Sequence, residues 1–163
     1  ENFLSKIYLK ADFHNIIKSG KISELTKFHA RNKYLLQTYN EKKMRKLGRI
    51  AANHKQLAVP IVYEKYERHF NEALKGESSY KKNINSLMHG LGYFKEILDK
   101  KEKEFFLEQL EKYRENKVPL SVPLNIMKSW IIKYDIDYLA KQSFFNPYPE
   151  ELIDLRDSAK NIR

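Results

Sequence analysis

The chain has 163 residues, with 31 Lys and Arg against 21 Asp and Glu, a formal net charge of +10 and no cysteine. The length suits one domain with an ordinary hydrophobic core. The lack of cysteine excludes disulfides, thiolate metal sites, a cysteine nucleophile and an iron–sulfur cluster ligated by this chain. The longest apolar runs fall far short of the roughly 20 residues of a membrane helix, and no signal peptide opens the chain. We therefore expect a cytoplasmic protein.

Apolar residues recur at three- and four-residue spacing along most of the chain, which favours helices over strands. We therefore expect an all-α fold, a compact bundle of about seven or eight helices in a single domain. The first helix is expected over residues 2–18, with Gly20 as its C-terminal signal. Its apolar face is expected to contain Phe3, Ile7, Ala11, His14 and Ile17.

The next three helices follow from caps and apolar spacing. Ser23 can cap a second helix, and Asn40 can end that helix or cap a third. Pro60 suits the first turn of a fourth helix, which ends before Gly76. The expected buried residues are Leu25, Phe28, Leu35, Leu36 and Tyr39, then Met44, Leu47 and Ala51, then Tyr63, Tyr66, Phe70 and Leu74.

The fifth helix is expected from Ser78 or Ser79 through Leu98, and Asp99 with Glu102 resembles a capping box that opens a sixth. Residues 118–123 form a connector, because Pro119 and Pro123 interrupt helical hydrogen bonding. A seventh helix starts near Pro123, a short eighth segment covers residues 136–145, residues 146–149 form a turn, and residues 150–163 form a tail helix. The expected apolar positions are Tyr80, Ile84, Leu87, Met88, Leu91 and Phe94, then Phe105, Phe106, Leu110 and Tyr113, then Leu124, Met127, Trp130 and Ile131.

Positive charge is concentrated in one stretch. Residues 27–55 hold nine Lys and Arg against Glu41 alone, whereas the segments on either side are nearly neutral. Helix surfaces normally mix signs, because opposite charges one turn apart are favourable and like charges repel. This stretch predicts a polyanionic partner, with nucleic-acid phosphate ahead of anionic lipid. The alternative is a solvated basic face that has no partner.

Helical spacing divides this stretch into two faces. Lys42, Arg45 or Lys46, and Arg49 recur one turn apart, opposite the apolar positions of the same helix. Lys81 and Lys82 add two charges at the start of the fifth helix, where free backbone N–H groups also suit phosphate. We expect these cations to be the main phosphate contacts.

The segment containing Gly90 and Gly92 is unusual, because glycine lowers helix stability by about 1 kcal/mol relative to alanine. Either the helices pack closely there, or a ligand approaches the backbone beside His89 and Lys95. His29 lies near an apolar boundary and is either a hydrogen-bonded structural histidine or a binding residue. No two histidines have the helical spacing of metal ligands, so no metal site is predicted.

Three functions remain open from the residues. The first is an RNA-binding module. The second is a small hydrolytic or ligand-binding enzyme built on His29, Arg31 and His89 with Asn53 as a polar partner, which requires these side chains to converge in one pocket. The third is a helical scaffold whose basic face docks an acidic protein domain.

The run Phe28-His29-Ala30-Arg31-Asn32-Lys33-Tyr34-Leu35-Leu36 resembles the signature F-H-x-R-x-K-x-L-L of the YbgA-like domain family, a domain of unknown function. The resemblance extends over about residues 23–155. Further matching segments are residues 46–53, 63–74, 89–95, 113–114, 118–124 and 146–152.

This resemblance implies an all-α domain that is often fused behind a TudS-like desulfidase, and that serves as the tRNA-binding part of RudS-like proteins. An iron–sulfur cluster would then belong to the desulfidase, and this chain would need no cofactor of its own. Because the chain opens at Glu1 without Met, we expect it to be processed or cut from a longer protein. The resemblance implies that residues 1–21 are an N-terminal helix or connector that follows an upstream domain, that residues 22–155 are the YbgA-like domain and that residues 156–163 are a tail. The candidate RNA-binding residues are His29, Arg31, Lys33, Lys42, Arg45, Lys46, Arg49, Lys81, Lys82, His89 and Lys95.

Overall fold

Helices and their connections account for residues 2–52 and 57–149, which the computed structural model describes, and this part of the chain has no strand. The predicted all-α fold is therefore confirmed. The elements in chain order are α1 (Asn2–Ser19), α2 (Ile22–Ala52), α3 (Val59–Leu74), α4 (Tyr80–Leu91), the 3-10 helix η2 (Gly92–Phe94), α5 (Lys100–Arg114), α6 (Ser121–Lys133) and α7 (Asp137–Ala140). The expected tail over residues 150–163 lies outside the described residues.

A kink divides α2 into two helical segments. Asn40 has non-helical backbone angles (φ −157°, ψ 98°), and its side-chain Oδ1 accepts a hydrogen bond of 3.0 Å from the backbone N–H of Lys43. Asn40 therefore caps the second segment, which is one of the two roles that the sequence allowed. We call residues 41–52 the basic segment of α2.

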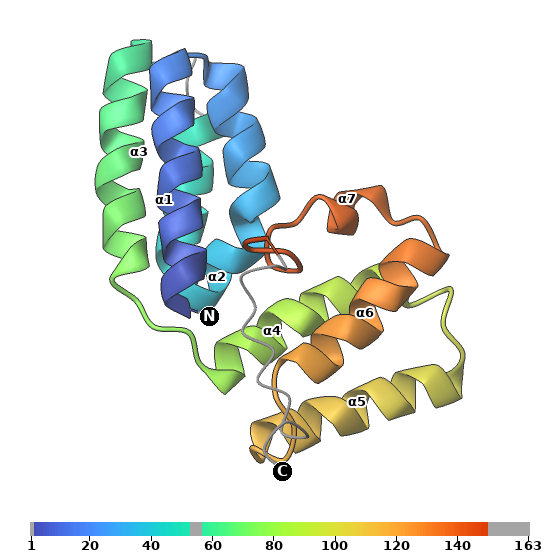
Figure 1. The fold of residues 1–163 in the computed structure, drawn as a ribbon. Coiled ribbons are helices and arrows are strands. Elements are labelled where there is room, and N and C mark those ends of the chain that lie inside the picture. The colour runs from blue at the N-terminus through green and yellow to red at the C-terminus, as the bar shows by residue number, and fades with distance from the viewer. Residues whose placement is uncertain (1, 53–56, 150–163) are drawn as a thin grey trace, which may run out of the picture.

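The helices form two layers. α1, the two segments of α2 and α3 lie side by side as an upright bundle, and α4, α5 and α6 cross beneath it (Figure 1). Contacts between α2 and α4 join the layers. At the centre of the bundle, the rings of Phe13, Phe28, Tyr66 and Phe70 lie with centroids 4.6–6.4 Å apart, a spacing typical of stabilising aromatic pairs.

Most predicted core positions are buried, but the predicted face of α1 is wrong. Its buried residues are Ser5, Leu9, Phe13 and Ile16, whereas Phe3, Ile7, Ala11 and His14 are exposed. The reason is that α1 is apolar on more than one side, so spacing alone does not identify the face that meets α2. The helix expected over residues 2–18 is present as α1, and it contacts α2.

The fifth predicted helix is also too long. α4 ends at Leu91 and continues as η2 and turns up to Leu98, rather than as one helix. Glycines at 90 and 92 weaken the α-helix at this point, and the chain tightens into a 3-10 turn. Tyr80, Met88 and Phe105, expected in the core, are exposed. The capping box of α5 is confirmed, with Asp99 Oδ1 accepting from Glu102 N at 2.8 Å and Glu102 Oε2 accepting from Asp99 N at 3.0 Å.

Candidate functional site

The basic segment of α2 presents one face to the core and the other to solvent. Met44, Leu47 and Ala51 are buried against the bundle. On the opposite side, the side chains of Lys42, Arg45, Lys46 and Arg49 are exposed, and we call these four residues the basic face. The predicted division of this helix is therefore confirmed.

Two cations of the basic segment are compensated by acidic partners. Arg45 pairs with Glu41 one turn earlier at 2.6 Å, and both side chains are well exposed. Lys43 pairs with Glu72 on α3, and hydrogen bonds from Lys43 and His69 lower the pKa of Glu72 to about 2. Lys43 thus fastens the basic segment to α3.

The other three cations of the basic face are uncompensated. Lys42, Lys46 and Arg49 form no ion pair with any residue in the part of the chain that the structure describes. They recur at three- and four-residue spacing, so they point to one side of the helix. This stripe is a local concentration of unpaired positive charge on the described surface.

His29 is a structural histidine in this fold. Its Nδ1 lies 3.0 Å from the hydroxyl of Tyr66, and a Cβ on Gly48 would lie 2.9 Å from its Nε2. Because Gly48 has no side chain, the imidazole of His29 fits between the part of α2 before the kink and the basic segment after it. Burial, together with the nearby charge of Lys33, lowers the pKa of His29 to about 4, so the ring is neutral at pH 7.

Two more sequence candidates hold the fold together. The guanidinium of Arg31 forms a two-pronged pair with the carboxylate of Asp12, which fastens α1 to α2. Lys82 donates from Nζ to the backbone oxygens of Tyr39 at 2.8 Å and Glu77 at 2.5 Å. Because Tyr39 precedes the kink, Lys82 satisfies a carbonyl that the interrupted helix leaves free.

The remaining candidates are exposed but come from different elements. Lys33 lies on α2 before the kink, Lys81 at the start of α4, His89 near the end of α4 and Lys95 just after η2. Lys95 lies 3.6 Å from the carboxylate of Glu96. The structure therefore brings together the basic face but not the whole predicted set.

The residues of the rival enzyme hypothesis do not converge. His29 bonds to Tyr66, Arg31 pairs with Asp12 at the α1–α2 contact, and His89 is exposed on α4. Asn53, their predicted polar partner, lies outside the described residues. Within residues 2–52 and 57–149 there is also no group of three or more His, Cys, Asp or Glu side chains that could hold a metal ion. The geometry thus gives the enzyme hypothesis no shared site.

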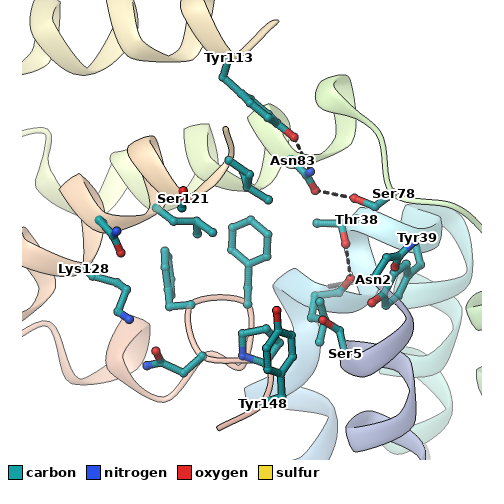
Figure 2. Close-up of a pocket in the computed structure, with 18 residues that line it drawn as sticks. Asn2, Ser5, Thr38, Tyr39, Ser78, Asn83, Tyr113, Ser121, Lys128 and Tyr148 are labelled. Atoms are coloured by element: carbon teal, nitrogen blue, oxygen red, sulfur yellow. Dashed lines mark hydrogen bonds between the residues drawn. The ribbon is translucent and has the colours of Figure 1, made fainter. Parts of the chain in front are cut away.

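A cleft of about 820 Å³ between the two layers was not predicted from the sequence. Its described lining is mainly hydroxyl, amide and aromatic, and Lys128 is the single charged side chain in it. On one wall, Asn83 donates to the hydroxyl of Tyr113 at 2.8 Å and accepts from the hydroxyl of Ser78 at 2.8 Å (Figure 2). No buried side-chain polar atom of the described residues lacks a hydrogen-bond partner, so nothing in this cleft calls for a particular ligand.

Sequence reasoning missed the cleft because its walls come from segments far apart in the chain. They are the starts of α1 and α4, the end of α2 before the kink, the end of α5, one side of α6 and residues 144–148. The available signal was that three segments of the family resemblance contribute to its lining, namely residues 113–114, 118–124 and 146–152. Only the tertiary structure places parts of these segments around one space.

Comparison with known proteins gives two matches. A family model described as "Protein of unknown function (DUF1722)" matches residues 33–149. The chain is also similar to the "Uncharacterized protein YbgA" of Escherichia coli strain K12, with 26% identity over 160 residues, covering 97% of this chain and 94% of that relative. No solved structure matches the chain. No helix in the described part of the chain is both long and apolar enough to cross a membrane.

Proposed function

The chain belongs to the DUF1722, or YbgA-like, family. From the surface of the chain we propose that it is an RNA-binding module. The basic face of α2 binds phosphate groups. The observation that carries the proposal is the stripe of three uncompensated cations, Lys42, Lys46 and Arg49, on one side of an exposed helix segment.

A stripe of this kind suits a sugar-phosphate backbone. Cations one helical turn apart are spaced by roughly 5–6 Å, close to the separation of successive phosphates along an RNA strand. Each contact releases condensed counterions, and this release supplies sequence-independent affinity. Lys43 and Lys82 stabilise the position of the basic segment. Lys43 pairs with Glu72 on α3, and Lys82 on α4 donates to the backbone oxygen of Tyr39 just before the kink.

Because the chain resembles the tRNA-binding part of RudS-like proteins, we propose that its RNA ligand is tRNA. We propose that the module holds thiolated tRNA for a TudS-like desulfidase, in the cytoplasm, either as a fused domain or as a separate partner. With no cysteine in its sequence, this chain supplies no thiolate ligand for an iron–sulfur cluster, so the desulfurisation belongs to the other domain. The curated relative is covered over 94% of its length and so has little room for such a domain. Association between separate chains is therefore part of the proposal.

Binding of fluorescein-labelled tRNA, followed by anisotropy from 50 mM to 400 mM salt, tests this function. If three to five phosphates are neutralised, log Kd should rise with log salt with a slope of roughly 2 to 4. An acidic polypeptide such as polyglutamate, at the same charge concentration, is the control for nonspecific polyanion binding. Absent or salt-insensitive tRNA binding refutes the proposal, and preferential binding of polyglutamate supports docking of an acidic protein instead.

A further inference from the structure

Neither backbone conformation nor close packing requires glycine at position 92. Its backbone angles are those of an ordinary right-handed helix (φ −56°, ψ −27°), and a Cβ built on it would meet nothing within 4 Å. By contrast, a Cβ on Gly90 would lie 2.6 Å from Sδ of Met127 on α6, so close packing of α4 on α6 explains that glycine. Of the two alternatives for this segment, packing accounts for Gly90 alone.

Three tyrosines form a cluster that ends in an exposed ring beside Gly92. The rings of Tyr93 and Tyr138 are stacked, with centroids 5.4 Å apart and planes 13° from parallel. On the other side, Tyr138 meets the buried Tyr34 edge-on, with centroids 6.4 Å apart. Tyr93 is thus a fixed outer ring, and it is 45% exposed.

Polar and cationic side chains border this cluster along the chain. His89 and Lys95 are exposed on either side of Gly92 in the sequence, Lys95 lies 3.6 Å from the carboxylate of Glu96, and Asp137, next to Tyr138, is paired with Lys141. Lys33 is exposed next to Tyr34 on α2. One turn before Lys33 lies His29, which contacts Gly48 in the basic segment. Lys33 is therefore adjacent in sequence to one ring of the tyrosine cluster and one helical turn from the histidine that contacts the basic segment.

We infer that Tyr93, supported by Tyr138, is a stacking platform for an unpaired RNA base, and that Gly92 lets the bound nucleotide approach the protein backbone. The inference rests on the proposed function and narrows it, because it selects RNA that presents an unstacked base in a loop or at an end rather than continuous duplex. Aromatic rings bind such bases by their π-faces with little regard to sequence. Their fixed geometry also lowers the entropy lost on binding.

The experiment uses a hairpin RNA with 2-aminopurine in its loop and a blunt duplex of the same length. Stacking of the loop base on Tyr93 should quench 2-aminopurine fluorescence, and the hairpin should bind more tightly than the duplex. Y93A should weaken hairpin binding roughly tenfold or more and remove the quenching, whereas Y93F should retain both. Y80A is the matched control, since Tyr80 is 43% exposed at the opposite end of α4.

G92A separates a binding role from a role in folding. Because residue 92 has helical angles and open space around it, G92A should melt at the same temperature as the parent or slightly higher. Hairpin binding should nevertheless fall several-fold while duplex binding stays unchanged. If G92A and Y93A bind hairpin like the parent, with salt dependence intact, the stacking inference fails and the RNA-binding proposal stands. If the parent binds neither RNA, the RNA-binding proposal itself fails.

Discussion

Neutralising two cations of the basic face should reduce the affinity for RNA, and counterion release predicts the size of the reduction. The variant K46Q/R49Q removes two exposed charges that form no ion pair with the described residues, so its unfolding temperature should match that of the parent. Each phosphate contact contributes about 0.7–0.9 to the salt slope, which is roughly five- to eightfold in affinity at 0.1 M salt. Loss of two contacts should therefore weaken binding roughly 25- to 60-fold.

The salt slope gives a second, independent readout of the same variant. Anisotropy titrations at several salt concentrations should show the slope decreasing by about 1.4 to 1.8, and the two proteins should converge in affinity near 1 M salt. K100Q/K101Q is the matched control, because both lysines are exposed at the start of α5 in the other layer and their removal changes the net charge equally. The control should lose little affinity.

The result that refutes this reasoning is equal loss in the two variants, which would mean that overall charge rather than the basic face attracts RNA. Unchanged affinity of K46Q/R49Q would move the phosphate contacts to other cations. Circular dichroism of both variants checks that helicity is preserved, so that a loss of binding reports contacts rather than unfolding.

Two further predictions concern stability. G76A should lower the free energy of unfolding by about 1–3 kcal/mol in denaturant titrations, because its Cβ would lie 2.4 Å from the carbonyl oxygen of Tyr39 and the backbone must shift; unchanged stability would contradict this contact. His29 has a native pKa of about 4, below its ordinary 6.5, so the unfolded chain binds the proton more readily. Stability should be fully present above pH 6.5 and decrease by up to about 3 kcal/mol as pH falls through 4, and H29A should flatten this dependence.

The sequence determined the local structure because caps and apolar spacing act over a few residues. Asn40, Asp99 and Pro60 mark helix starts in the sequence and do so in the structure. The division of the basic segment into a buried and an exposed face also follows from its period alone. Even so, the sequence indicates only that Lys42, Arg45, Lys46 and Arg49 share a face, and not which of them are compensated.

Only the tertiary structure decided which charges remain free and which faces meet. Lys43 and Arg31 look as available as Lys46 in the sequence, yet partners 29 and 19 residues away along the chain engage them. The buried face of α1 was set by its contact with α2, which local periodicity does not encode. The same holds for the glycines, since packing against Met127 explains Gly90 whereas no packing contact requires Gly92. Local physics therefore fixed the helices and the basic stripe, whereas contacts between distant segments selected the residues left to bind.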